Sequence, residues 1–450
     1  MKKENSNKKQ IKRTVNYQKI FCFISFIFLA ICCLWYGGRA VYFYLATRKT
    51  FENEDKLLSI VVLSNNEGNK NFKKIGSDYY FYKDAENNYL TYSNMTWRIL
   101  KVTRDDEVVL IQDAPVTNLA YGEEKQYKDS YVVEWLNKQK KDYTGILETN
   151  LNNKEKYLTK TKECIDTIND VNKATCNKTD NNNYLAIPSV IDYVNTGGKS
   201  GFMNNGYYTY LINSNKKNNI WYIDAEGKLN TGDGTDIYGV KATITVKSTV
   251  SIIDGDGSKD KPYTIEDKTS LFASYVQLGN DIWRIYEENG NNVKLVLNDY
   301  LKIDNENLKY IYSNKNYYHN DTVYGSLAYY LNHNYLRSLT YSDLVVENKY
   351  SNYYYGEETN FDYTTLLNNT ISTKVTTLSI GDPILNNNAE DYFFATGTSK
   401  NDDLVYTIKK NATMESQDIS TKAYVVPCIS IDKSILKTGT GRIDDPYRTE

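Results

Sequence analysis

The nine residues GDGSKDKPY, Gly255–Tyr263, return near the end of the chain as GTGRIDDPY, Gly439–Tyr447. Both copies read G-x-G-x-x-D-x-P-Y, and the second begins 184 residues after the first. Glycine tolerates positive φ and proline fixes φ, so the phrase is typical of a tight turn. Each copy follows an apolar run that is typical of a strand. We therefore predict a turn that ends a domain, written once for each of two domains.

The duplication extends upstream of this turn. NYLTYSNMTWRIL (Asn88–Leu100) matches SYVQLGNDIWRIY (Ser274–Tyr286), and the two tryptophans lie 186 residues apart. Weaker matches follow in the same order in both copies: EWLN with YYLN, NIWYID with LVYTIK, and GVKATITV with YVVPCISI. A common order over so long a period indicates a tandem duplication of a domain of about 185 residues rather than a short solenoid repeat.

Alternating apolar residues over 96–112 and 282–298 predict a β-hairpin in each copy. Segments 130–141 and 187–195 have helical spacing, with Ser130 as the N-cap of the first. Later strands are expected at 219–224, 238–247 and 250–254. The predicted fold class is α+β, an N-terminal transmembrane helix followed by two tandem related mixed α/β domains with mainly antiparallel sheets.

The N-terminus predicts a membrane anchor. Seven lysines and arginines fall within residues 1–19, and the uncharged segment Ile20–Tyr36 is close to the shortest length that spans a bilayer. The basic side is expected in the cytoplasm, which leaves the bulk of the chain extracellular in a single-pass protein of the cell membrane. A cleaved signal peptide is the alternative, but a small-x-small cleavage site is poor.

These observations predict five segments along the chain. They are a basic cytoplasmic tail (1–19), a transmembrane anchor (20–46), a stalk (47–74), extracytoplasmic repeat 1 (75–266) and extracytoplasmic repeat 2 (267–450).

Three of the six cysteines lie in the apolar N-terminal segment, and Cys428 lies in an apolar run typical of a core. Cys164 and Cys176 stand in a polar stretch and are predicted to form a disulfide if the compartment is oxidising. Closing so short a loop contributes about 3 kcal/mol in the chain-entropy model. Two free thiols are the alternative, whereas a zinc site would need further ligands nearby.

The first terminal turn also permits a calcium interpretation. Oxygen-bearing side chains alternate over residues 254–260, as in oxygen-ligand loops. However, Lys259 stands where an EF-hand loop needs glycine, and the second copy has Thr440 in place of Asp256. We favour the structural turn, leave calcium binding at 254–260 open, and predict no metal or cofactor.

Charge and histidine content narrow the possible chemistry. The formal net charge of -2 predicts no nucleic-acid partner. His319 and His333 are the two histidines, which discourages a histidine metal site or a Ser-His-Asp site in the first half of the chain. A glycosidase-like carboxylate pair stays open, with Glu134, Asp192 and Asp224 as candidates that no pattern pairs.

Tyrosine is abundant, with 43 residues against 13 phenylalanines. The stretch Tyr350–Tyr363 differs most between the copies, and exposed tyrosines there would contact sugars or proteins. A codon bias that also enriches Asn, Lys and Ile explains the same abundance without any binding role. Composition alone therefore does not locate a binding surface.

The repeated phrases resemble a domain of unknown function found in extracytoplasmic proteins of low-GC Gram-positive bacteria. NYLTYSNMTWRIL, EWLN, IPSVIDYV, GVKATITV and GDGSKDKPY carry the resemblance. It covers residues 75–266 well and 267–450 less well, because TLSIGDPI departs from the pattern and the Gly-Val-Arg-Pro phrase has become VVPC. The family implies a surface or secreted location and no established activity.

Three functions are consistent with the sequence. The first is a membrane-anchored cell-surface protein with two non-catalytic binding or scaffolding domains, whose partner is an envelope polysaccharide or another surface protein. The second is a cell-wall-acting hydrolase or transferase, marked by two facing carboxylates with a raised pKa. The third is a sensory or regulatory subunit of an envelope complex.

Overall fold

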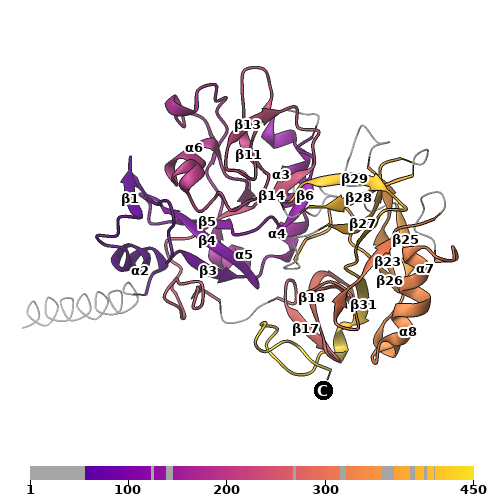
Figure 1. The fold of residues 1–450 in the computed structure, drawn as a ribbon. Helices are drawn as coiled ribbons and strands as arrows, with labels where there is room; N and C mark the ends of the chain where they lie inside the picture. The colour runs from indigo at the N-terminus through magenta and orange to yellow at the C-terminus, as the bar shows by residue number, and fades with distance from the viewer. Residues whose placement is uncertain are drawn as a thin grey trace, which may run out of the picture. The chain divides into compact units, whose positions relative to one another are not determined.

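β-Strands dominate the computed structural model, which describes residues 56–122, 126–137, 145–266, 270–314, 321–355, 369–385, 391–399, 403–409 and 411–449 (Figure 1). Strands make up 37% of the structure and helices 16%, in several antiparallel sheets. The predicted α+β class was therefore wrong, and the fold is mainly β. Many short segments for which the sequence predicted no element pair as strands, and their Tyr, Thr, Ile and Val residues suit a pleated and half-buried surface.

The first repeat contains two large sheets. The first sheet has the order β1 (Phe72–Ile75), β2 (Asp78–Phe81), β4 (Met95–Val102), β5 (Val108–Gln112), β15 (Thr243–Val246) and β10 (Leu185–Ala186), with β3 (Tyr89–Tyr92) on β4, β16 (Tyr263–Thr264) on β3 and β7 (Leu158–Thr159) on β15. The second has the order β13 (Leu229–Gly232), β12 (Ile220–Ile223), β11 (Thr209–Ser214), β14 (Tyr238–Val240) and β6 (Thr117–Leu119).

The second repeat builds the same two sheets. The first has the order β17 (Tyr275–Leu278), β18 (Asp281–Asn289), β19 (Asn292–Leu297), β31 (Cys428–Asp432) and β26 (Val375–Thr376). The second has the order β29 (Met414–Asp418), β28 (Leu404–Ile408), β27 (Tyr392–Gly397), β30 (Lys422–Tyr424) and β22 (Lys309–Ile311), with β24 (Tyr353–Tyr354) on β27.

The strand pairings correspond in detail. The β4–β5 hairpin shifts register between Ile99 and Lys101, and the β18–β19 hairpin shifts between Ile285 and Glu287. In each second sheet one pair is parallel, β11 with β14 and β27 with β30. Both predicted hairpins are confirmed.

Three small ladders complete the described strands. They are β8 (Glu163–Cys164) with β9 (Thr179–Asp180), β20 (Lys302–Ile303) with β21 (Glu306–Asn307), and β23 (Asn348–Ser351) with β25 (Thr370–Thr373).

The helices are short. They are α2 (Leu58–Asn65), α3 (Tyr131–Leu136), α4 (Ile146–Asn150), α5 (Lys154–Tyr157), α6 (Val190–Asn195), α7 (Leu327–Tyr329), the π-helix η4 (Tyr330–Tyr335), α8 (Leu336–Ser338), and the 3₁₀ turns η1 (Tyr127–Asp129), η2 (Val171–Lys173), η3 (Gly198–Ser200), η5 (Ser342–Leu344) and η6 (Lys433–Ile435). Ser130 caps α3 as predicted, since its side chain accepts a hydrogen bond from the amide of Val133. The predicted strand at 250–254 forms only isolated bridges.

The Leu-Asn phrase has one structural role in both repeats. Asn137 at the end of α3 donates to the carbonyl of Leu185 and accepts from its amide, at 2.8 and 3.0 Å. Asn332 does the same with Val375, at 2.9 and 3.1 Å. Each asparagine thus ties a helix to the last strand of the first sheet.

The repeated terminal phrase closes each repeat on its own opening strand. Gly255 and Gly439 have φ of 102° and 90°, and a Cβ on either would lie 2.1 Å from the carbonyl oxygen of the following proline. The carbonyl of Gly257 accepts from the amide of Tyr89, and that of Gly441 accepts from Tyr275, both at 2.8 Å. These contacts account for the two glycines of the phrase and confirm the predicted turn.

The two repeats also contact each other directly. The indole of Trp135 donates to the carbonyl of Gly381 at 2.7 Å, and the amide of Ile384 donates to Val116 at 2.7 Å. Residues Leu57–Glu450 cluster as one compact unit. The limits of the repeats stay a prediction. The described part of the expected stalk, residues 56–74, contributes α2 and β1, and Leu58 and Val62 are buried.

The predicted membrane anchor, 20–46, and the basic tail, 1–19, lie outside the described residues. Across the helices that the structure describes, none combines the length and apolar character needed to cross a bilayer. The single-pass assignment, the cell-membrane location and the membrane as a partner are corrected accordingly. They rested on the apolar segment and the basic residues before it, and no described helix supports them.

Candidate functional site

The structure places the three predicted carboxylates in different local networks. Glu134 lies on α3, and Asp192 lies in the first turn of α6. Asp224 follows β12 and accepts hydrogen bonds from the amides of Glu226 and Lys228, at 3.1 and 2.7 Å. Asp224 therefore holds a turn.

Of the two histidines, His319 lies outside the described residues. His333 is half-buried on η4, stacks on Tyr329 with ring centroids 4.4 Å apart, and has Nε2 3.1 Å from the carbonyl of Asp321. The tyrosine stretch expected to contact a ligand contributes Tyr350 and Tyr353 to the core, and residues 356–368 are outside the described part.

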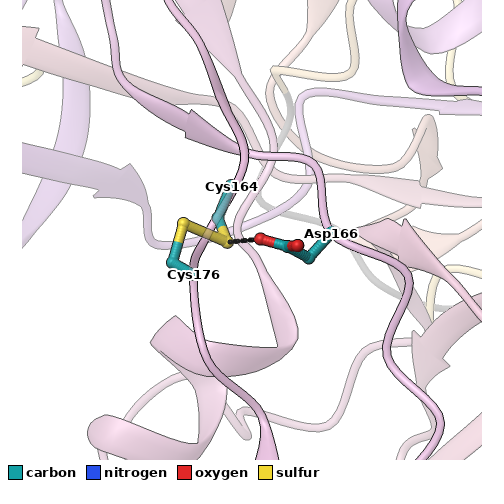
Figure 2. Close-up of side chains that lie close together, drawn as sticks. All are labelled: Cys164, Asp166 and Cys176. Atoms are coloured by element: carbon teal, nitrogen blue, oxygen red, sulfur yellow. Dashed lines mark hydrogen bonds between the residues drawn. A yellow bond between two sulfur atoms is a disulfide. The ribbon is translucent and has the colours of Figure 1, made fainter.

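Cys164 and Cys176 form a disulfide, with Cα atoms 5.7 Å apart (Figure 2). Asp166 points at this bond because its Oδ2 accepts from the amides of Asn177 and Lys178, at 2.6 and 2.8 Å. One ligand atom from each of Cys164, Asp166 and Cys176 lies within 4.8 Å of the others, the one such group among the described residues. Because the two sulfurs are bonded to each other, they are not available as thiolate ligands.

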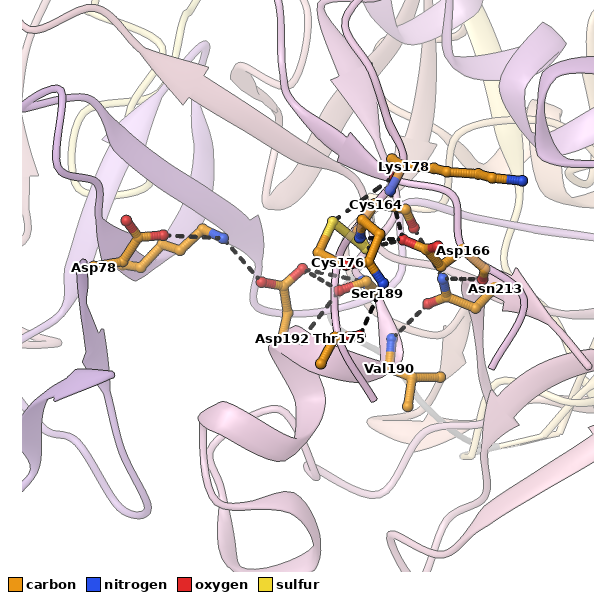
Figure 3. Close-up of a disulfide and its surroundings, with 12 residues drawn as sticks. Asp78, Cys164, Asp166, Thr175, Cys176, Lys178, Ser189, Val190, Asp192 and Asn213 are labelled. Atoms are coloured by element: carbon orange, nitrogen blue, oxygen red, sulfur yellow. Dashed lines mark hydrogen bonds and ion pairs between the residues drawn. A yellow bond between two sulfur atoms is a disulfide. The ribbon is translucent and has the colours of Figure 1, made fainter. Parts of the chain in front are cut away.

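A hydrogen-bonded chain connects the disulfide loop to α6 (Figure 3). The side-chain Nδ2 of Asn213 donates to the backbone carbonyls of Cys164 and Asp166, both at 2.9 Å. Its side-chain Oδ1 accepts from the backbone N–H of Val190 at 2.8 Å. Ser189 and Asp192 then form a reciprocal capping box at the start of α6. Asn213 thus couples the position of the clipped loop to the start of this helix.

Asp192 continues the chain into the first sheet. Its Oδ1 lies 3.2 Å from Nζ of Lys101, which also donates to the hydroxyl of Tyr80 at 3.0 Å. Burial alone would lower the pKa of Lys101, but Asp192, Tyr80 and Asp78 outweigh it and raise that pKa above its usual value. Burial would raise the pKa of Asp192, but Lys101 and Ser189 together lower it. Both groups are therefore charged at neutral pH.

The second repeat has the same turn with different partners. The amide of Ser379 donates to Oδ2 of Asp382 at 2.7 Å, as the amide of Ser189 donates to Asp192. The shared register places Glu287 where the first repeat has Lys101, and Glu287 pairs with Lys294 at 2.8 Å. Burial raises the pKa of Asp382 to about 7, and the charge of Glu287 adds to the effect.

Sequence reasoning missed a pair of acidic residues next to the disulfide. Glu163 and Asp180 are cross-strand partners in the β8–β9 ladder, so their side chains lie on one face. Glu163 is 3% exposed, and burial followed by the charge of Asp180 raises its pKa to about 8. The two-residue strands carry no periodic signal that would have revealed this pairing.

Sequence reasoning also missed a cluster of tyrosines on the second sheet of the first repeat. We call Tyr208, Tyr210, Tyr222 and Tyr238 the tyrosine face. The ring of Tyr238 lies 5.3 Å from that of Tyr208, 5.1 Å from Tyr210 and 4.8 Å from Tyr222, between centroids. Tyr210 is buried, whereas the other three are half-buried and keep part of each ring in solvent.

Polar groups border the tyrosine face. The exposed carboxylate of Asp236 accepts from the hydroxyl of Tyr238 at 3.1 Å. Gly232 lies beside this carboxylate. A Cβ atom added to Gly232 would lie 3.5 Å from the ring of Tyr222 and 3.8 Å from Oδ2 of Asp236. The glycine therefore leaves the ring edge and the carboxylate uncovered.

The four matching positions of the second repeat carry no tyrosine. Strand registers pair Tyr210 with Tyr222, and Thr209 with Gly239. The matching registers in the second repeat place four other residues at the positions of the tyrosine face: Asp391, Phe393, Thr407 and Ala423. The face is a property of one repeat only. A comparison of the chain with family models, curated proteins and solved structures found no match.

Proposed function

We propose that the chain is a non-catalytic binding protein whose first repeat holds a polysaccharide against the tyrosine face. The observation that carries the proposal is the cluster of three partly exposed rings, Tyr208, Tyr222 and Tyr238, on one sheet surface. Aromatic rings offer large apolar contact area, and their hydroxyls add polar contacts at the rim. The C–H faces of sugar rings match such a surface.

The rim of the face supports the same ligand class. Asp236 is an exposed acceptor next to the rings, and sugar hydroxyls are donors that suit a carboxylate. The disulfide between Cys164 and Cys176 supports a place of action in an oxidising compartment, where such bonds persist. The resemblance to extracytoplasmic domains of unknown function stays a proposal that agrees with this setting.

Retention of the full chain on insoluble peptidoglycan, chitin and cellulose tests the proposal, with soluble sugars assayed in the same tubes. We expect retention on at least one polymer without release of products. Tyr222→Thr with Tyr238→Ala, which installs the residues of the second repeat, should reduce retention at least about tenfold, the equivalent of about 1.4 kcal/mol. Tyr324→Ala is the matched control, because Tyr324 is 80% exposed and lies outside the face. Equal retention of all three proteins would refute the proposal.

A second candidate function is acid–base hydrolysis by Glu163 and Asp180. The raised pKa of Glu163 beside a second carboxylate favours it, since a general acid must hold a proton near neutral pH. The burial of Glu163 places it second, because a substrate bond must reach the acid. Soluble products in the retention assay that disappear with Glu163→Gln, and persist with Tyr222→Thr, would favour hydrolysis over binding.

A further inference from the structure

A buried lysine of the first repeat makes one hydrogen bond to a carboxamide. Lys241 lies between β14 and β15 and is 2% exposed. Its Nζ donates to Oδ1 of Asn205 at 2.8 Å. The aligned residue of the second repeat is Val426, which is fully buried. This position is thus buried in both repeats, and the first repeat alone has a lysine at it.

The environment increases the fraction of Lys241 that is present as the neutral amine. Burial lowers its pKa to about 8, although the carboxylate of Asp113 opposes this shift and Arg98 adds to it. A neutral amine has a free electron pair and is a nucleophile, as an ammonium is not. The ring of Tyr207 lies 5.6 Å from Nζ and forms part of the surroundings.

The carboxamide of Asn205 is held at both ends. Its Oδ1 accepts from Lys241, and its Nδ2 donates to the carbonyl of Asp113 in a short hydrogen bond. The carbonyl carbon between these atoms is therefore fixed next to the amine. The side chain of Asp113, which lies 3.4 Å from Nη1 of Arg98, supplies the carboxylate of the cluster.

We propose that Lys241 and Asn205 join in an amide (isopeptide) cross-link within the first repeat. Nζ of Lys241, as the neutral amine, attacks Cγ of Asn205 and gives up one of its protons. The bond from Cγ to Nδ2 then breaks, and Nδ2 takes the proton and leaves as ammonia. One C–N bond forms and one breaks, so the reaction needs no oxidant, reductant or further reactant.

The cross-link would tie the loop around Asn205 to the junction of β14 and β15. That junction precedes β15, which pairs with β5 in the first sheet, while β14 pairs in the second sheet. The bond would therefore fasten the place where the chain passes from one sheet to the other.

Mass spectrometry of the full chain tests the proposal. We expect an intact mass lower by one ammonia and, after trypsin, a joined species of peptides 200–216 and 229–247, uncleaved after Lys241. Lys241→Arg should abolish the joined species. Lys228→Arg, an exposed lysine of the same repeat, should still lose ammonia, and circular dichroism reports whether each variant folds.

Asn205 precedes Gly206, and an Asn-Gly pair can lose ammonia alone by forming a succinimide with the glycine nitrogen. Loss of ammonia confined to a single peptide that contains Asn205 would therefore overturn the proposal. A full, unchanged mass of the wild-type chain after prolonged incubation at pH 8 would also overturn it. Only the joined peptides support it.

Discussion

Asp192 of the first repeat and Asp382 of the second follow the same Ser-x-x-Asp turn, yet their carboxyl groups behave in opposite ways. Lys101 and the capping box lower the pKa of Asp192, whereas burial raises that of Asp382 to about 7. The backbone of the two repeats fixes where the carboxyl lies. The residue on the facing strand is a lysine in one repeat and Glu287 in the other. Lys101 lowers the pKa of Asp192, whereas burial is the main cause of the raised pKa of Asp382 and Glu287 adds to it.

The tyrosine face follows the same rule. The strands beneath it recur in the second repeat, where the aligned positions carry Asp391, Phe393, Thr407 and Ala423. A duplicated scaffold thus carries a candidate binding surface, a disulfide and the Lys101–Asp192 pair on one copy. Each of these three features can be removed by its own substitution.

The largest expected effect is loss of the Lys101–Asp192 pair. Asp192→Ala leaves a mostly buried ammonium without its nearest carboxylate, which costs about 3–5 kcal/mol of unfolding free energy. Asp382→Ala should cost much less, because Lys294 keeps Glu287 at 2.8 Å. Urea unfolding at pH 7 measures both variants, and equal losses would contradict the distinction.

The disulfide should contribute about 3 kcal/mol, because it closes a short loop between residues that are 12 apart. Replacing Cys164 and Cys176 by serine together removes it. Hydrogen exchange should then speed up in α6, which Asn213 links to the loop, and stay unchanged in β27 and β31. Faster exchange in both repeats would show that the clip is not local.

The two aspartates predict opposite pH dependences. Asp382 has a raised pKa, so its contribution to stability is full below 3.8 and is lost as the pH rises to about 7. Asp192 has a lowered pKa, so its contribution is present above 3.8 and is lost as the pH falls through the lowered value. Each unit of pKa shift corresponds to about 1.4 kcal/mol.

Asn substitutions at the two sites measure these dependences. Relative to wild type, Asp382→Asn should gain stability as the pH rises from 4 towards about 7. Relative to wild type, Asp192→Asn should lose stability as the pH rises through the range just below and around 3.8. Urea unfolding of both variants at several pH values checks this, and slopes of one sign would contradict the assignment of charges.

The smallest expected effect is at the repeated turn. Lys261 pairs with Asp254 at 3.1 Å, but both side chains are mostly exposed. The second turn has Thr438 in place of Asp254 and keeps the same backbone hydrogen bonds. Lys261→Met should therefore give a denaturation curve that coincides with wild type. A clear loss of stability would mean that the glycines do not suffice to hold the turn.

The sequence predicted the features that rest on local pattern. The duplicated phrase, both hairpins and the cap at Ser130 all follow from spacing and residue type. The fold class was missed because the helices are short and the strands between them are irregular. Hydropathy predicts an anchor at 20–46, and no described helix supports it.

The candidate sites depend on register, which the sequence did not reveal. Tyr222 meets Tyr210 and Tyr238 only because three strands pair in one particular order. Glu163 meets Asp180 through strands of two residues. Lys241 meets Asn205 across a loop that no sequence pattern pairs with it, and the residues of the second repeat that align with this loop lie outside the described part.

Calorimetric titration tests the central claim most directly, that one repeat alone carries the binding face. The full chain is titrated with a soluble hexasaccharide of whichever polymer retains it, alongside Tyr222→Thr. The account predicts one site per chain, with affinity at least about tenfold weaker in the variant. Two equal sites per chain, or one site unaffected by Tyr222→Thr, would contradict it.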